Sequence, residues 1–198
     1  MSTISPTQMQ VLRLRCSAAL LALLVCWVSP LVKAEDEGTI LRNKIQAAYV
    51  YHFTKFIQWP NSAFASADSP LRICVAVADD DKTYYSPLGQ RTTAGRAIEV
   101  IYKFDTSNVS LCHMVVIGQG PKGEEFEVLL TRIAGEPVLT VSEIENFIEL
   151  EGMIQFVLEA GKVRLSINLE AIKKSDLTIS SKLLEVALQV YNEGDKRP

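Results

Sequence analysis

The sequence contains one motif with the spacing of a nucleotide-binding loop, the segment Gly118-Gln119-Gly120-Pro121-Lys122-Gly123. The segment follows an apolar stretch and precedes a helical one, and Glu143 lies 20 residues beyond Gly123, where dinucleotide-binding proteins carry a ribose-binding acid. Pro121, however, removes a backbone donor from the loop, and the motif follows about the third predicted strand instead of the first. We interpret the segment as a turn that caps a helix, with anion binding by Gly118, Gly120 and Gly123 as the weaker alternative.

Histidine, cysteine and aspartate offer little further chemistry. The two histidines, His52 and His113, do not form an H-E-x-x-H motif, and the chain has no G-x-S-x-G motif. Cys112 and His113 are adjacent in a predicted strand, where neighbouring side chains point to opposite faces. The run Asp79-Asp80-Asp81 lacks the glycine spacing of a calcium loop. We therefore expect no catalytic residue, no metal site and no cofactor, and a protein that is not an enzyme.

Residues 1–34 have the pattern of a secretory signal peptide. Arg13 and Arg15 precede eleven consecutive apolar residues, Ala18–Val28, and Pro30 ends this run before the small residue Ala34. A retained membrane anchor is the alternative, but the apolar run is about half of the ~20 residues that a bilayer core requires. We expect cleavage after Ala34, which leaves a domain of residues 35–198.

Removal of this segment changes both the charge and the cysteine count. The chain has 20 Lys+Arg and 23 Asp+Glu, and residues 1–34 hold three of the basic residues and no acidic one, so residues 35–198 carry 17 against 23, a net charge of -6. Such a charge does not attract nucleic acid. Cys74 and Cys112 remain as a pair in an oxidising compartment, which favours a disulfide. Two buried free thiols are the alternative, because each cysteine lies in an apolar run.

The apolar pattern of residues 35–198 predicts a single α/β domain, a mixed sheet flanked by helices with a C-terminal β-hairpin and helix. A long helix with an aromatic face occupies residues 40–57 and ends at Trp59-Pro60. The further predicted elements are strand 71–78, a turn-rich stretch 79–94, strands 97–103 and 111–118, helix 124–134, strand 138–141, a short helical start at 142–146, hairpin strands 153–158 and 162–169, and helix 182–191 capped by Ser180. The continuous apolar strands indicate a sheet buried on both faces, whereas the alternating hairpin can expose one side.

Seven short blocks, in order along the chain, resemble the YfiR family of exported proteins. The blocks are Lys44–Pro60, Ile73–Val75, Thr93–Arg96, Cys112-His113, Leu139–Glu143, Gly152–Ile154, and Ser166–Asn168 together with Leu177–Leu184. Together they cover nearly all of residues 35–198. The resemblance departs at Glu151 and Asp176, where relatives often have glycine, and in the absence of the second cysteine pair that some relatives carry.

This resemblance implies a periplasmic regulatory protein that binds the periplasmic domain of an inner-membrane diguanylate cyclase and represses it. Repression would lower cyclic-di-GMP and biofilm formation, and capture of the repressor by an outer-membrane lipoprotein would relieve it. The resemblance also implies a structural disulfide between Cys74 and Cys112. We further expect a homodimer. The alternatives are a periplasmic protein that binds a small molecule or an anion, and the sensor subunit of a two-component system that contacts a sensor kinase.

Two parts of the chain are the predicted partner-binding surface. They are the polar turn with Asn168, Glu170, Lys173, Lys174 and Asp176, and the aromatic helix with Tyr51 and Phe56. Aromatic residues are enriched in protein interfaces, which supports the second part. The alternative is that the charges only solubilise the surface and the aromatic rings only pack the core.

Overall fold

The structure is a computed structural model that describes residues 37–118 and 123–192. The described residues belong to one compact unit that begins at Glu37. The predicted signal peptide therefore lies outside the described residues. Among the residues that are described, no helix combines the length and apolarity needed to span a bilayer.

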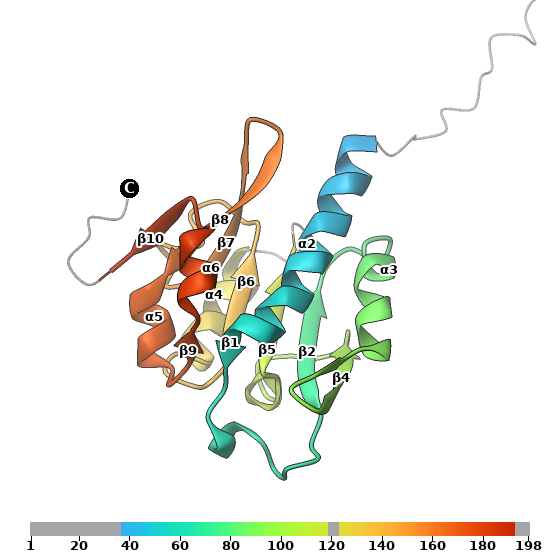
Figure 1. Ribbon diagram of the computed structural model, residues 1–198, viewed down its shortest axis with the longest axis vertical. Coiled ribbons are helices and arrows are strands. Elements are labelled where there is room, and N and C mark those ends of the chain that lie inside the picture. Colours follow the sequence, from blue (N-terminus) through green and yellow to red (C-terminus); the bar gives the residue numbers. More distant parts are fainter. Residues whose placement is uncertain (1–36, 119–122, 193–198) are drawn as a thin grey trace, which may run out of the picture. The chain divides into compact units, whose positions relative to one another are not determined.

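An eight-stranded mixed sheet forms the centre of this unit, in the order β10-β8-β7-β6-β5-β2-β4-β3 (Figure 1). Its strands are β2 (Leu71–Ala76), β3 (Thr92–Thr93), β4 (Arg96–Ile101), β5 (Met114–Ile117), β6 (Leu139–Ser142), β7 (Ile154–Glu159), β8 (Lys162–Asn168) and β10 (Gln189–Tyr191). The pairs β4–β2, β2–β5, β5–β6, β6–β7 and β8–β10 are parallel. The pairs β7–β8 and β3–β4 are antiparallel. A separate antiparallel pair joins β1 (Ile57–Gln58) to β9 (Thr178–Ile179). The predicted mixed α/β fold is confirmed.

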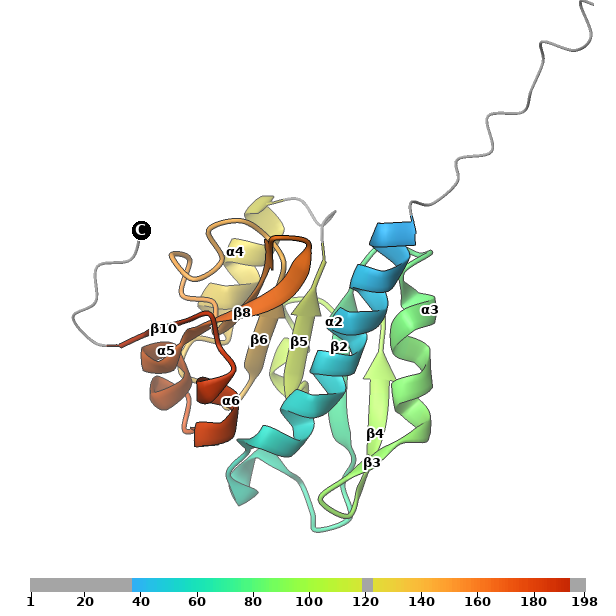
Figure 2. The same cartoon turned by 45° about the horizontal axis from the view of Figure 1, so that its top comes forward.

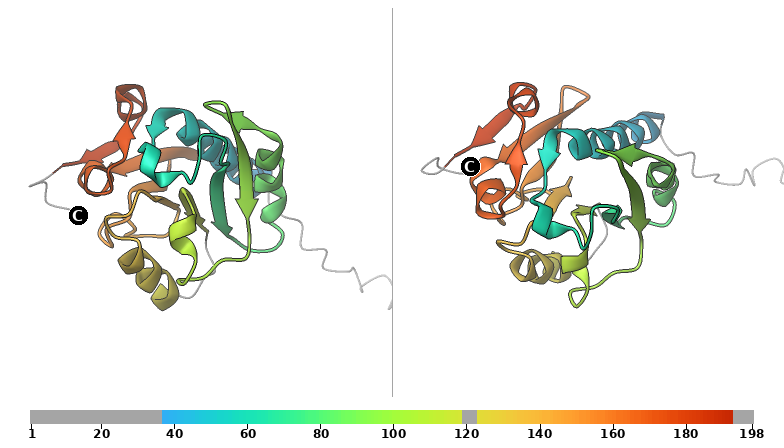
Figure 3. Two further views of the ribbon diagram at one scale, coloured as in Figure 1. Left: turned by 90° about the horizontal axis from the view of Figure 1, so that it is seen from below. Right: turned by 60° about the horizontal axis from the view of Figure 1, so that its bottom comes forward.

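Helices cover both faces of the sheet (Figures 2 and 3). The α-helices are α2 (Glu37–Phe56), α3 (Lys82–Tyr85), α4 (Gly123–Arg132), α5 (Leu169–Lys174) and α6 (Ser181–Glu185), and the 3₁₀ helices are η1 (Asn61–Ala63), η2 (Ser86–Gln90) and η3 (Val109–Leu111). The first helix ends at Phe56, just before the predicted stop at Trp59-Pro60. The hairpin and the helix predicted after residue 123 are also present.

Alternation along the central strands divides the core into two layers. In β2, Ile73 and Val75 belong to the cluster that contains Phe53 of α2. Cys74, between them, belongs to the cluster that contains Phe126 of α4. Successive strand residues point to opposite faces, so one apolar strand supplies both layers. Each fully buried side chain of this size stabilises the fold by about 1.5–3 kcal/mol.

The predicted C-terminal helix 182–191 is wrong in its second half. The side chain of Ser180 accepts a hydrogen bond from the Lys182 amide, as a helix cap should, but α6 ends at Glu185. The chain then becomes extended, and β10 pairs in parallel with β8, with the Leu188 amide donating to the Leu165 carbonyl at 2.7 Å. A strand here satisfies the backbone groups along β8, which a continued helix would leave unpaired.

Three shorter predictions also differ from the structure. The turn-rich stretch 79–94 contains α3 and η2, whose few residues give no readable period. The predicted helical start at 142–146 is a strand end followed by turns. Cys112 and His113 lie between η3 and β5, instead of inside a strand.

The two β-hairpins β3–β4 and β7–β8 have the same dipeptide, Ala-Gly, in their turns. Ala94-Gly95 joins β3 to β4 with φ angles of 47° and 80°, and Ala160-Gly161 joins β7 to β8 with φ angles of 48° and 75°. Two consecutive residues of positive φ are typical of the type I′ turn, whose twist matches that of the flanking strands. Glycine adopts this conformation without strain, whereas alanine does not.

Replacing Ala160 by asparagine should raise the free energy of unfolding by about 0.5–1 kcal/mol, because asparagine tolerates positive φ better than alanine. Urea titration followed by circular dichroism measures the change. Ala97→Asn is the control, because Ala97 lies in β4 and asparagine is disfavoured in strands. An equal effect of both substitutions would contradict a turn-specific gain.

Glu151 and Asp176, the two positions where relatives often have glycine, also have positive φ angles. Glu151 has a φ of 64° and Asp176 a φ of 55°. Both positions therefore require the left-handed region that favours glycine, which explains the residue found in relatives. At both positions this chain therefore places a side chain on a backbone conformation that glycine adopts without strain.

Candidate functional site

The Gly118–Gly123 segment, which we interpret from the sequence as a helix-capping turn, lies only partly within the described residues. Gly118 follows β5, and a Cβ atom added there would lie 2.9 Å from Cγ1 of Val77, so glycine allows close approach of the segments after β2 and β5. Gly120 lies outside the described residues, and Gly123 begins α4. The close approach of Val77 is enough to explain why glycine occupies position 118. Anion binding by this segment stays an untested prediction.

Glu143, the nominal ribose-binding acid, holds α2 against the sheet. Its Oε2 accepts a hydrogen bond from Nε2 of Gln46 at 2.9 Å and lies 3.8 Å from Nε of Arg42. Beside it, Nδ2 of Asn43 donates to Oδ1 of Asp81 at 2.7 Å. These contacts between side chains give the buried polar groups of α2 partners, which is a structural role.

The predicted polar turn is divided between the interior and the surface. Asn168 is 0% exposed, and its Oδ1 accepts a hydrogen bond from the Ala171 amide at 3.1 Å, so it caps α5. The prediction that Asn168 contacts a partner is therefore wrong for this conformation. Glu170 forms an ion pair with Lys174, while Lys173, Lys174 and Asp176 are exposed. These exposed residues stay a predicted contact surface.

The two predicted aromatic residues of α2 have different surroundings. Phe56 is half-buried and stacks on His52 with ring centroids 6.4 Å apart. Tyr51 is also half-buried, but it lines an open groove at the C-terminal end of α2. Tyr51 therefore belongs to a groove whose residues the sequence analysis did not group together.

We call this surface the aromatic–basic groove, and its volume is about 710 Å³. Its lining residues are Tyr51, Thr54, Lys55, Ile57, Gln58, Trp59, Asn61, Phe64, Leu71, Thr92, Thr93, Ala94 and Arg96. They come from the end of α2, from β1 and the segment that leads to the start of β2, and from the β3–β4 hairpin. The size of the groove is that of a ligand site, for which the usual range is about 300–1,000 Å³.

Cations stand over the aromatic rings of this groove. Nζ of Lys55 lies 4.5 Å from the ring centroid of Tyr51, and Cζ of Arg91 lies 5.5 Å from the same centroid. Cζ of Arg96 lies 3.8 Å from the centroid of Phe64. Cation–π contacts of this kind contribute about 0.5–1 kcal/mol each at exposed sites, so they help to order the basic side chains.

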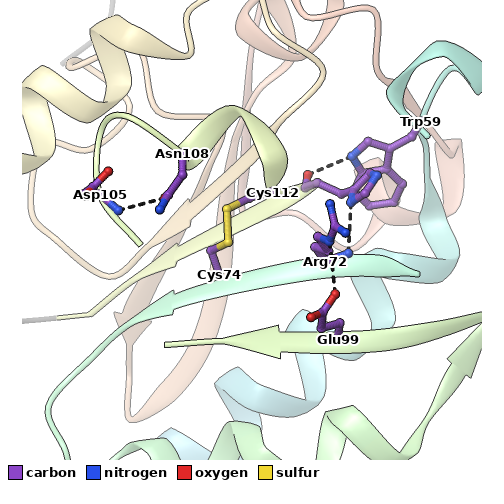
Figure 4. Close-up of a disulfide and its surroundings, with 8 residues drawn as sticks. Trp59, Arg72, Cys74, Glu99, Asp105, Asn108 and Cys112 are labelled. Carbon is purple, nitrogen blue, oxygen red and sulfur yellow. Dashed lines mark hydrogen bonds and ion pairs between the residues drawn. A yellow bond between two sulfur atoms is a disulfide. The ribbon is translucent and has the colours of Figure 1, made fainter. Parts of the chain in front are cut away.

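The segment between β1 and β2 forms one wall of the groove and is held by His113. Nε1 of Trp59 donates to the His113 carbonyl at 2.8 Å, as Figure 4 shows beside the disulfide. The imidazole Nδ1 accepts from the Arg72 amide at 3.0 Å, so the proton lies on Nε2, which donates to the Ala63 carbonyl at 3.1 Å. The ring also stacks on Phe64 with centroids 4.4 Å apart.

Protonation of His113 would break this arrangement. Burial lowers the pKa of His113; its hydrogen bond to Ala63 acts in the opposite direction, and the charges of Arg72 and Arg96 lower the pKa further. The unfolded chain therefore binds a proton more readily than the folded one. The stabilisation from neutral His113 is fully present above about pH 6.5, the ordinary histidine pKa, and is lost as the pH falls below it.

His113→Asn should therefore reduce the loss of stability between about pH 6.5 and pH 5, since asparagine retains an acceptor but does not titrate. Thermal unfolding across this pH range compares the variant with the wild-type chain. His52→Asn, at an exposed position of α2, is the matched control for loss of an imidazole. If His113→Asn kept the full pH dependence, His113 would not be its source.

The disulfide lies on the opposite side of β2 from α2. Cys74 and Cys112 are bonded, with Cα atoms 5.9 Å apart, and join β2 to the segment before β5 (Figure 4). Both cysteines are buried in the core layer beneath α4. The expected disulfide is thus present, and the alternative of two free thiols is wrong.

A search of the curated proteins gives no match. A solved structure described as the ABC domain in complex with L-Trp from Streptococcus pneumonia is 12% identical, with a TM-score of 0.44 over 61% of this chain and 55% of that chain. The match spans about half of that protein. The model of the family described as YfiR/HmsC-like matches residues 43–188. The chain is therefore a member of the YfiR/HmsC-like family.

Proposed function

We propose that this protein is a periplasmic regulator that binds and represses a membrane-anchored diguanylate cyclase, and so lowers cyclic-di-GMP and biofilm formation. The observation that carries this proposal is the YfiR/HmsC-like match over residues 43–188. Membership of this family supports a regulatory role in cyclic-di-GMP signalling instead of catalysis. The signal-peptide pattern of residues 1–34 supports a periplasmic location.

Repression would follow from differential binding. A protein that binds the inactive state of a receptor more tightly than the active state shifts the population toward the inactive one. The strength of repression is limited by the ratio of the two affinities. Release by an outer-membrane lipoprotein would act by competition for the repressor, and a homodimer would present two equivalent surfaces to the receptor.

Deletion of the gene should raise the cellular concentration of cyclic-di-GMP, because the cyclase loses its repressor. Mass spectrometry of nucleotide extracts measures the change. Expression of residues 1–198 should restore the low concentration, whereas expression of residues 35–198 should not, since the latter lacks the signal for export. An unchanged concentration after deletion would contradict the proposed function.

A further inference from the structure

The aromatic–basic groove concentrates positive charge on an acidic protein. Residues 35–198 carry a net charge of -6, yet the groove is lined by Lys55 and Arg96 and contains no Asp or Glu among its lining residues. Arg91 adds a third cation at the ring of Tyr51. Within residues 37–118 and 123–192, no carboxylate forms an ion pair with any of these three side chains.

Several other basic side chains of the described residues form ion pairs with carboxylates. Arg72 pairs with Glu99, Lys82 with Asp79, Arg164 with Glu159 and Lys174 with Glu170. Lys55 and Arg91 lie at the same tyrosine ring, so a single anionic group placed there would be attracted by both cations. The charge of the groove is therefore complementary to an anionic ligand.

The shape of the groove favours an extended peptide over a small molecule. Its floor is buried and includes Ile57 and Leu71, its walls are the half-buried rings of Tyr51, Trp59 and Phe64, and its rim is exposed. Small-molecule sites usually enclose most of the ligand, which an open groove does not.

Polar rim residues can also bind a peptide backbone. Gln58, Asn61 and Thr92 line the groove and are exposed. Thr92 belongs to β3, the last strand at this edge of the sheet, so the outer side of β3 has no neighbouring strand among the described residues. An extended segment can use such an edge together with side-chain pockets.

We propose that the aromatic–basic groove binds an acidic, extended segment of the membrane-anchored partner. The proposal rests on the proposed function, which requires such a partner. Carboxylates of the segment contact Lys55 and Arg91 at the rim, and an apolar side chain of the segment packs between the rings of Tyr51 and Trp59. Arg96 has a structural role as well, because its Nη1 donates to the carbonyls of Ser66 and Ser69.

A direct binding experiment tests the charge preference. The probe is a fluorescein-labelled dodecapeptide of alternating glutamate and glycine with a central phenylalanine, and fluorescence anisotropy measures its binding to residues 35–198. The double variant Lys55→Glu/Arg91→Glu should weaken binding about tenfold or more, because it reverses two contacts to the peptide. Lys103→Glu/Lys162→Glu is the matched control, since it reverses two exposed lysines elsewhere and should leave binding unchanged.

Peptides of the same design with glutamine or lysine in place of glutamate should bind at least tenfold more weakly. Equal binding of the glutamine peptide, or equal binding by the double variant, would overturn the proposal. Free glutamate or inorganic phosphate, each at a concentration equal to that of the peptide's carboxylates, should not displace the peptide. Displacement by either anion would overturn the proposal, because it would indicate a site for small anions. Thermal unfolding of both double variants verifies that each is folded.

Complementation of the deletion strain distinguishes failure of the groove proposal from failure of the proposed function. If deletion raises cyclic-di-GMP and the full-length Lys55→Glu/Arg91→Glu chain restores the low concentration, the groove is not the contact surface, although the repressor function stands. If Lys55→Glu/Arg91→Glu fails to restore it while Lys103→Glu/Lys162→Glu does, the groove proposal is supported. If deletion has no effect on cyclic-di-GMP, the repressor function fails, and with it the identification of the segment as part of that partner.

Discussion

Replacing both Cys74 and Cys112 by alanine should lower the free energy of unfolding by about 4 kcal/mol. The disulfide closes a loop with a sequence separation of 38 residues, and its loss returns conformational entropy to the unfolded chain. For a domain of this size the midpoint of thermal unfolding should fall by roughly 8–16 °C. Both sulfur atoms lie in the core layer beneath α4, so the two alanines also leave small cavities that add to the loss.

Reduction of the wild-type chain provides the comparison for this experiment. Wild-type protein unfolded in dithiothreitol should approach the stability of the double alanine variant, whereas the variant itself should not respond to dithiothreitol. Guanidinium titration measures all four conditions. A difference of less than about 1 kcal/mol between wild type and variant would show that the loop is already restricted in the unfolded chain.

Gly152→Ala should be the most damaging glycine substitution in the described part of the chain. A Cβ atom at this position would lie 2.3 Å from two ring carbons of Phe147 and 2.5 Å from its carbonyl oxygen. Phe147 is fully buried, and its carbonyl accepts a hydrogen bond from the Gly152 amide at 2.9 Å, so neither group can move away easily. We expect a loss of about 2–3 kcal/mol, in the upper part of the range that is typical of overpacking a core.

A second substitution can test the steric origin of this loss. Phe147→Leu on the Gly152→Ala background should recover part of the stability, because it removes the ring atoms but leaves the carbonyl contact. Gly89→Ala is the matched control, since the added Cβ would only meet Cγ2 of Val100 at 4.0 Å. Urea titration should show little change for the control, and a similar loss at both glycines would contradict the packing explanation.

Most of the central sheet follows from local sequence patterns. The strands around Ile73 and Val116 are apolar runs that a sheet covered on both faces requires, and the structure places them there. The hairpin at Ala160-Gly161 is predicted because its strands alternate and its turn contains glycine. Helix α2 is predicted because its apolar residues recur at helical spacing and proline follows it.

Predictions fail where pairing with a distant segment overrides local preference. Residues 189–191 continue a helical apolar pattern, yet they form β10 because β8 offers unpaired backbone groups. Asn168 is polar and follows a strand, as a surface residue could, yet it is buried because its side chain caps α5. In both cases the deciding partner is a group whose position is not encoded in the neighbouring residues.

The aromatic–basic groove could not be predicted for the same reason. Lys55, Arg91 and Arg96 are separated in the chain and resemble ordinary surface charges. Only the packing of the β3–β4 hairpin beside α2 brings Arg91 and Lys55 to the same ring of Tyr51. The one local signal was the excess of aromatic residues in α2, more than a single buried face of a helix requires.

From the sequence alone follow the fold class, the pattern of an export signal, the expectation that Cys74 pairs with Cys112, and the family resemblance. These features depend on composition, periodicity and short motifs, which are properties of neighbouring residues. Only the tertiary structure decided that Asn168 is buried, that the last apolar segment is a strand, and that three separate cations share an aromatic groove. Those outcomes depend on contacts between distant segments, because hydrogen bonding and charge compensation are set by the partners that folding brings together.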